Sequence, residues 1–241
     1  MFDHNLLLKR RDKNKGRFSK ANFLHQFAED EIIFRAQAIS ESYNNILELG
    51  SRDDLFEKKL RKIISFNSYL KIKEIESSNL ESKKFDLIIS NLSFHHLNDF
   101  VSAVKIMKSA LNDNGVLLFS IFGNDTLLDL KRKFAEIEDK NNNVAYQRII
   151  PMIRDQDIVN ILNMSGFKEI IVDGESQEVI YQNFDKLISD IRHMSENNIM
   201  SSVKKMIDKK TCREIKSNYS KEFSVKFDII FATAIKSDGG R

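Results

Sequence analysis

Polar residues that could bind or act on a small molecule follow two short apolar runs. Glu48, Gly50 and Ser51 close the run that begins at Asn45, and Asn91 to His96 follow the run at 85–90. A glycine lets the backbone turn close beneath a ligand, and a carboxylate beside it can reach that ligand. The first stretch is therefore typical of the opening turn of a nucleoside-binding α/β domain, although a strand end without a ligand has the same pattern.

Two further residues have side chains that could orient a reacting group. His95 and its neighbour His96 lie just after the second apolar run, and Asp125 lies two residues after Gly123. No cysteine or carboxylate completes a ligand set at the spacing of a zinc site, so we predict no metal. His95 and Asp125 stay as candidates for proton transfer or for holding an acceptor, and a histidine that simply caps the loop is the alternative for His95.

These candidates need elements that bring them to one edge of a sheet. The runs at 85–91 and 115–122 are nearly all apolar, which is typical of parallel strands covered on both faces. The segment between them, from Phe100 to Leu111, has apolar residues at helical spacing and a capping residue at Asn98 or Asp99. We therefore predict a strand, helix, strand unit. Ligands bind beyond the carboxyl ends of such strands.

The stretch between the first turn and this unit is short. We predict a second strand at 62–67 and a third at 70–75. An acidic residue usually ends the second strand and binds a ribose, and this chain has Asn67 there. Glu74 or Glu76 could lie near an adenine edge, and an exposed loop carboxylate is the alternative.

The remaining pattern predicts helices after Gly123, at 155–165 and at 184–194, with strands at 169–173 and 223–235. The last strand first alternates and then becomes apolar throughout, as an edge or antiparallel strand does. We expect residues 1–43 to form a basic N-terminal arm and a helical cap. Residues 44–241 should form the main domain, with a helical insertion around 183–210.

Composition limits the possible partners. The chain has 241 residues and a net charge of +3 that is spread along the sequence, so no nucleic-acid partner is predicted. Its longest apolar run is too short to span a bilayer, and the first residues have no secretory apolar region. A single cysteine excludes an intramolecular disulfide. We expect a soluble, cytoplasmic protein.

Five motifs together resemble one family. The chain is similar to class I S-adenosylmethionine-dependent methyltransferases, and within them to the respiratory complex I assembly factor 5 family with its bacterial relatives. The methyltransferase of biotin synthesis is also similar. The motifs are Phe2-Asp3-His4-Asn5-Leu6, Leu47-Glu48-Leu49-Gly50, the segment 85–99, Phe122-Gly123-Asn124-Asp125-Thr126-Leu127 and Gly166-Phe167.

The resemblance implies an α/β fold of the Rossmann-like class I methyltransferase type. Its sheet is mostly parallel with a reversed last strand, and here it is abridged by about one βα unit. S-adenosyl-L-methionine is the implied cofactor. Its implied contacts are with Glu48, Gly50, Ser51, Asn67, Glu74, Asn91 and Leu92. His95 and Asp125 are the candidates for orienting the acceptor.

Three functions are compatible with this resemblance. The first is an enzyme acting on a protein substrate, possibly a complex I subunit, by methylation or by arginine hydroxylation. The second is an assembly factor that keeps the fold without binding the cofactor; the residues Arg52 and Asp54, where the family has glycines, favour it. The third is a malonyl-carrier-protein O-methyltransferase.

Overall fold

The computed structural model describes residues 1–73, 80, 83–142, 144–201 and 206–237. It divides into two compact units, each built from separate stretches of the chain. The sheet unit comprises Phe23–Gly123, Ile153–Glu175 and Ile229–Arg241. The helical unit comprises Met1–Asn22, Asn124–Met152 and Ser176–Asp228. The predicted boundary between residues 43 and 44 stays a prediction of the sequence.

Among the described residues, the sheet has six strands in the order β2-β1-β3-β4-β6-β5. β1 is parallel to β2 and β3, β3 is parallel to β4, and β4 pairs with β6 in the antiparallel sense. The reversed last strand and the α/β class are therefore confirmed. The strands are β1 Ser42–Leu49, β2 Ser65–Ile72, β3 Phe85–Ser90, β4 Leu111–Phe122, β5 Glu169–Tyr181 and β6 Phe223–Ile235.

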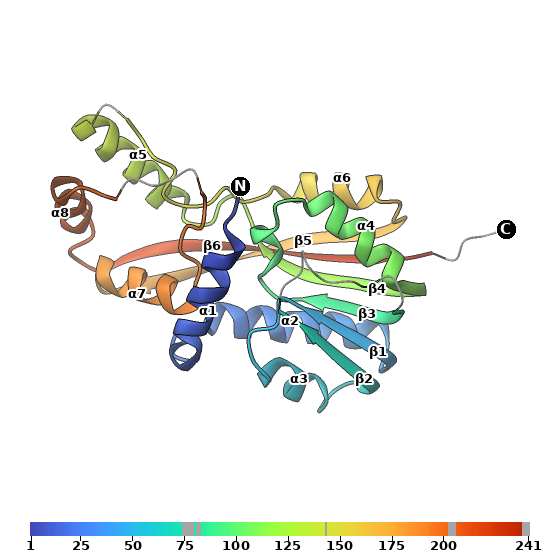
Figure 1. Ribbon diagram of the computed structural model, residues 1–241. Helices are drawn as coiled ribbons and strands as arrows, with labels where there is room; N and C mark the ends of the chain where they lie inside the picture. Colours follow the sequence, from blue (N-terminus) through green and yellow to red (C-terminus); the bar gives the residue numbers. More distant parts are fainter. Residues whose placement is uncertain (74–79, 81–82, 143, 202–205, 238–241) are drawn as a thin grey trace. The chain divides into compact units, whose positions relative to one another are not determined.

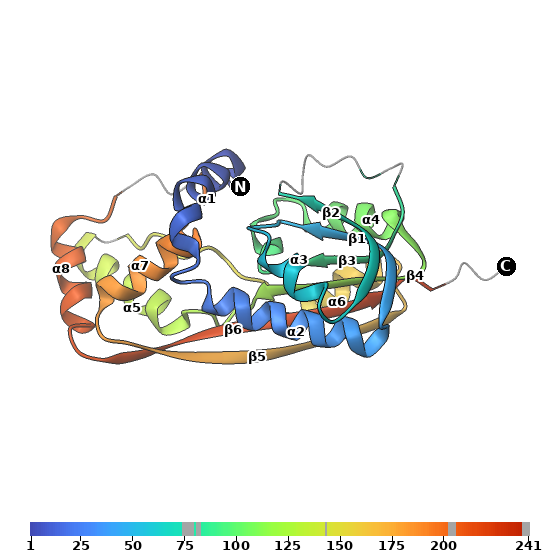
Figure 2. The ribbon, with the colours of Figure 1, turned by 90° about the horizontal axis from the view of Figure 1, so that it is seen from below.

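Helices cover both faces of this sheet (Figures 1 and 2). α2 (Phe23–Ile39) lies on one face, and α4 (Phe100–Ala110) and α6 (Asp155–Met164) lie on the other. α3 (Leu55–Leu60) follows the first turn. β3 and β4 are buried almost throughout, which explains why both read as continuous apolar runs.

The strand, helix, strand unit predicted around residue 100 is confirmed. α4 begins after Asp99, whose side chain accepts a hydrogen bond from the Ser102 backbone N–H at 2.9 Å. Val104 and Met107 of this helix are buried in the core on that face of the sheet, together with Ile158 and Leu162 of α6. The cap and the apolar face thus act at the positions that the sequence indicates.

The predicted second and third strands are wrong as two elements, because residues 65–72 form the single strand β2. Its partner β1 pairs with it continuously from Ser42 opposite Ser65 to Leu49 opposite Ile72. Ser68, which lies between the two predicted strands, is within the ladder and donates a hydrogen bond to Asn45 Oδ1 at 2.7 Å. One strand in place of two agrees with the abridged fold.

The helical unit contains α1 (His4–Phe18), α5 (Leu128–Asn142), α7 (Phe184–Met194) and α8 (Lys209–Asn218). The basic N-terminal segment is not a solvated arm, because α1 packs against α7. Arg10 donates hydrogen bonds to the carbonyls of Asn197 and Asn198 at 3.2 and 2.8 Å.

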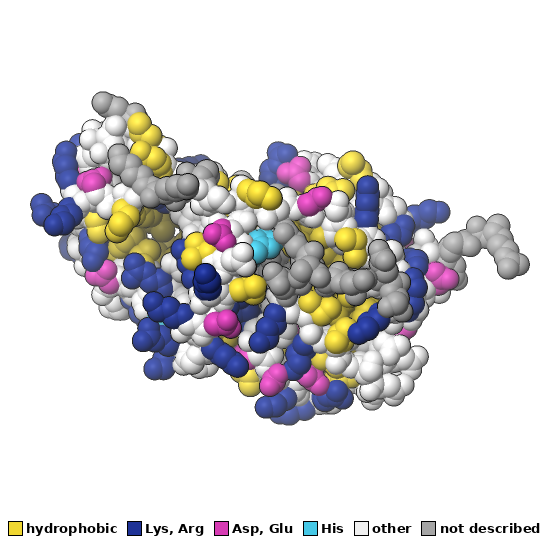
Figure 3. All heavy atoms as spheres, in the orientation of Figure 1, with side chains coloured by type: hydrophobic (Ala, Val, Ile, Leu, Met, Phe, Trp, Pro, Cys, Tyr) yellow, Lys and Arg dark blue, Asp and Glu magenta, His cyan; other side chains and the backbone are white. Residues whose placement is uncertain are grey.

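Arg11, the next residue of α1, is partly buried, and burial lowers the pKa of its guanidinium while Glu196 opposes the shift. Some charges of the basic N-terminal segment are thus used within the helical unit. Elsewhere, basic side chains are distributed over the face drawn in Figure 3, with acidic side chains among them. Among the described residues, no helix has the length and apolar character needed to cross a bilayer.

Asp86 of β3 connects three strands of the sheet unit. Its Oδ2 accepts hydrogen bonds from the backbone N–H groups of Asn44 and Asn45 at 2.9 and 2.8 Å, and its Oδ1 accepts one from Asn112 Nδ2 at 2.6 Å. The pairing of β3 with β4 shifts register at this residue, between Phe85 and Leu87. The carboxylate therefore replaces ladder bonds at an irregular position.

We predict that Asp86→Leu lowers the free energy of unfolding by about 2 kcal/mol or more, because two strand N–H groups and one amide lose a charged acceptor. Urea unfolding measured by circular dichroism checks this. Asp113→Leu removes an exposed carboxylate that lies 3.5 Å from Lys236 Nζ and should change stability little. Equal stability of both variants would contradict the role assigned to Asp86.

Candidate functional site

The turn after β1 has the conformation that a ligand-binding glycine needs. Gly50 has φ of +75°, a left-handed conformation that side chains with a Cβ rarely adopt. Its N–H donates a hydrogen bond to the Ile72 carbonyl at 2.7 Å, so the turn is fixed to the carboxyl end of β2. Ser51 is buried next to it. Glu48, Gly50 and Ser51 thus lie together at this end of the sheet unit.

Glu48 is a carboxylate placed in the interior of the sheet unit. Its side chain is 3% exposed, and Oε2 accepts a hydrogen bond from the Tyr69 hydroxyl at 2.9 Å. Burial raises the pKa of Glu48 to about 7, and the hydroxyls of Tyr69 and Ser51 and the charge of Lys71 act in the opposite direction. Burial and the neighbouring Glu48 also raise the pKa of Tyr69. A cationic ligand group nearby would therefore stabilise the ionised Glu48.

Asn91 and Leu92 follow β3, whose carboxyl end is paired with that of β1. Leu92 has φ of +40°, which is uncommon for a residue with a branched side chain. Its N–H donates to Ser120 Oγ at 3.0 Å, and that hydroxyl donates to Asn91 Oδ1 at 2.9 Å. The Asn91 amide in turn donates to the His25 carbonyl at 2.9 Å.

This buried chain of hydrogen bonds connects β4, the turn after β3 and helix α2. It uses both ends of the Asn91 side-chain amide inside the sheet unit. Asn91 is thereby placed to hold the turn of Leu92. The expectation that Asn91 and Leu92 contact a cofactor stays a prediction.

Glu29 of α2 is a site residue that the sequence reasoning missed. It is buried, and its carboxylate lies 3.4 Å from Lys59 Nζ. Burial raises the pKa of Glu29 to about 7, and Lys59 opposes this shift. Its Oε1 is 3.5 Å from Asn91 Nδ2. A signal existed in the sequence, since His25 and Glu29 lie four residues apart within the buried stripe of a helix.

Asp54, one of the two residues that stand where the family has glycines, has a partner of its own, and so has the neighbouring Asp53. Asp54 forms an ion pair with Lys71, whose Nζ also lies 2.9 Å from Glu57 Oε2. Asp53 Oδ1 accepts a hydrogen bond from the Leu55 N–H at 2.8 Å, at the start of α3. Their carboxylates thus stabilise the turn and the short helix, and Lys71 draws the Asp54 side chain toward β2.

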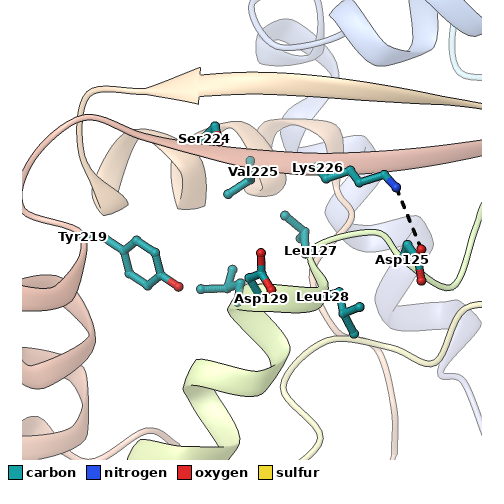
Figure 4. Close-up of a pocket in the computed structure, with 9 residues that line it drawn as sticks. Asp125, Leu127, Leu128, Asp129, Tyr219, Ser224, Val225 and Lys226 are labelled. Carbon is teal, nitrogen blue, oxygen red and sulfur yellow. Dashed lines mark ion pairs between the residues drawn. The ribbon is translucent and has the colours of Figure 1, made fainter.

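The two candidates for orienting an acceptor belong to different units. His95 lies in the short helix η1 (Phe94–His96) of the sheet unit, where it is 6% exposed and its ring centroid is 5.0 Å from that of Phe122. Asp125 lies in the helical unit, 3.9 Å from Lys226 Nζ. It borders a pocket of about 190 Å³ that Tyr219 enters from the other side (Figure 4).

Asn67 and Glu74 are two of the expected cofactor contacts. Asn67 does not end the second strand, because β2 continues to Ile72. Asn67 lies in the first half of β2, where its amide donates to Asn44 Oδ1 at 3.0 Å, so the prediction that it ends the strand and binds a ribose there is wrong. Glu74 lies outside the described residues.

We predict that Glu48→Gln alters the pH dependence of stability. The folded state binds a proton at Glu48 up to about pH 7, whereas the unfolded chain releases it near 4.5, so this group makes stability fall as pH rises between these values. Glutamine keeps the acceptor for Tyr69 and removes the titration. As the pH rises from 4.5 to about 7, the free energy of unfolding of the variant should increase relative to that of the parent protein, by up to roughly 3 kcal/mol.

Urea titrations at several pH values check this expectation. Glu169→Gln, which changes an exposed carboxylate at the start of β5, is the matched control and should leave the pH profile unchanged. An unchanged profile for Glu48→Gln would show that this carboxyl has no raised pKa.

Comparisons with known proteins agree with the fold. A family model described as a methyltransferase domain matches residues 20–171. The mitochondrial arginine-hydroxylase NDUFAF5 of Dictyostelium discoideum is 36% identical over 125 residues, which are 52% of this chain and 29% of that protein. Malonyl-[acyl-carrier protein] O-methyltransferase 1 of Coxiella burnetii is 26% identical over 187 residues, which are 77% of this chain and 62% of that protein.

A solved structure shows the same fold at low identity. That of BH2331 from Bacillus halodurans, a proposed methyltransferase, has a TM-score of 0.51 at 11% identity, with 85% of this chain and 97% of that chain covered. The chain spans 29% to 43% of the NDUFAF5 proteins of D. discoideum and Rattus norvegicus. The family match covers most of the sheet unit's strands and the turn at Gly50, and on that ground the chain belongs to the methyltransferase domain family.

Proposed function

We propose that this protein binds S-adenosyl-L-methionine at the carboxyl ends of β1 and β3. The observation that carries the proposal is the buried carboxylate of Glu48 beside Gly50 in its left-handed conformation. A cationic group that binds near a buried carboxylate stabilises its ionised form. The cofactor has two such groups, an ammonium and a sulfonium. The residues present therefore fit this cofactor.

Each residue has a proposed part in holding the cofactor. Glu48, Gly50 and Ser51 would contact its methionine portion, and Leu92, held by Asn91 and Ser120, would border the sulfonium. When bound, the cofactor supplies an activated methyl group. The protein's contribution is to position the acceptor and exclude water, since methyl transfer depends mainly on proximity and alignment. His95 and Asp125 stay as proposed orienting groups.

We also propose a protein substrate, one that belongs to the assembly of respiratory complex I. The motifs that resemble the assembly factor 5 family support this, as does the similarity to proteins named arginine-hydroxylase NDUFAF5. The reaction on that substrate is methylation or arginine hydroxylation. The cytoplasm is the compartment that we propose for it.

A second candidate function is a cofactor-free assembly factor. The specific observation in its favour is the ion pair of Asp54 with Lys71 at the turn, where the family has a glycine. A side chain held there by a partner is compatible with a turn that serves the fold alone. Methylation of a malonyl carrier protein is the third candidate, and the similarity to the enzyme of C. burnetii favours it.

Calorimetric titration with S-adenosylmethionine and with S-adenosylhomocysteine tests the first proposal. We expect saturable binding, and we expect Glu48→Gln to weaken it by about tenfold, because a charged hydrogen bond or ion pair is lost. Gly50→Arg should abolish binding, since it forces a side chain into a left-handed turn that a ligand approaches.

The control variant is Glu169→Gln, the same substitution at an exposed position of the sheet unit. It should bind the cofactor as the parent protein does. Circular dichroism shows whether each variant is folded. Absence of binding at millimolar cofactor in a folded sample would reject the enzyme and favour the cofactor-free assembly factor.

A further inference from the structure

A second pocket lies in the helical unit, between helix α5 and the segment that follows it. Its volume is about 410 Å³, within the range of roughly 300–1,000 Å³ that is typical of ligand sites. Most of its lining is apolar. The lining residues are Asn124, Lys131, Phe134, Ala135 and the segment Ala145, Tyr146, Gln147, Arg148, Ile149, Ile150, Pro151 and Met152. We call it the Lys131 pocket.

The wall of this pocket is held in place by a buried carboxylate. Glu138 of α5 is completely buried, and its Oε2 accepts a hydrogen bond from the Tyr146 backbone N–H at 2.8 Å. Its Oε1 accepts one from Arg148 Nε at 2.7 Å, and the Arg148 guanidinium carbon lies 4.9 Å from the Tyr146 ring centroid. The pocket is therefore largely preformed, with the charge of Arg148 balanced by Glu138.

Lys131 is the group in the pocket whose charge is not balanced by a contact. Its Nζ donates a hydrogen bond to the Asn124 carbonyl at 3.4 Å, and no carboxylate of the described residues lies within ion-pair distance of it. Burial lowers the pKa of the Lys131 ammonium, although Asp125 acts in the opposite direction. Asp125 itself pairs with Lys226. A half-buried ammonium of this kind gains most from an anion that binds beside it.

We infer that the Lys131 pocket binds a carboxylate carried on an apolar chain, as in a fatty acid. The carboxylate would pair with the Lys131 ammonium, and the chain would lie along Phe134, Ala135 and Ile149. A compact anion without an apolar part would leave this lining exposed to water, so its binding would be weaker. All residues that line the pocket belong to the helical unit, and none of them is among the residues proposed to hold S-adenosylmethionine.

Titration of the full chain with sodium octanoate, followed by calorimetry, tests this inference. We expect saturable binding, and we expect Lys131→Met to weaken it by tenfold or more because the charged hydrogen bond is lost while the aliphatic stem is kept. Octan-1-ol has the same chain without the charge, so it should bind the parent protein more weakly than octanoate does. Its affinity for Lys131→Met should equal its affinity for the parent protein. Acetate, which has the charge without the chain, should bind weakly to both.

The matched control is Lys133→Met, on the same helix. Lys133 Nζ lies 2.7 Å from Glu136 Oε2 and does not line the pocket, so this variant should bind octanoate as the parent protein does. Ala135→Phe, which fills the pocket from α5, should abolish binding in a sample whose circular dichroism is unchanged. Octanoate binding that is absent in the folded parent, or equal in Lys131→Met, would overturn the inference.

Discussion

The fold buries the Glu48 carboxyl group, away from water, near the end of β1. Such a group is costly unless it is protonated, hydrogen-bonded or paired. The Tyr69 hydroxyl from the neighbouring strand supplies the hydrogen bond, and burial raises the pKa to about 7. The register of β1 with β2, which places Glu48 opposite Lys71 and Tyr69 opposite Ile46, is thus required by electrostatics as well as by the ladder.

The same constraint extends through the interior of the sheet unit. Glu29, the second buried carboxylate, is linked with Asn91, and Asn91 is linked through Ser120 to the left-handed turn at Leu92. Buried polar groups stabilise a fold only when each member has a partner. Helix α2 therefore helps to hold the turn at the carboxyl ends of the strands, in addition to covering one face of the sheet.

The sequence predicts the parts of this fold in which periodicity and capping agree. The segment from β3 to β4 is an example, because two continuous apolar runs enclose a helix that starts at Asp99. The sequence-based prediction is wrong at β2, where Ser68 interrupts the apolar pattern although the strand continues. The strand continues there because Asn45 of β1 supplies a hydrogen-bond partner for the Ser68 hydroxyl. Glu48, Gly50 and Ser51 could be located from spacing. The partners of Asn91 could not, because they come from α2 and β4, which are distant in the sequence.

β2 is the outermost strand on its side of the described sheet. A strand at the edge of a sheet presents a row of backbone groups that can pair with a second chain. Ser65, Ser68 and Asn67 are exposed along this strand, and its apolar side chains are only partly buried. Hydroxyl and amide side chains on a free edge make an intermolecular sheet less favourable than apolar ones would. Within the part of the chain that the structure describes, the polar character of β2 is thus a safeguard against aggregation at this edge.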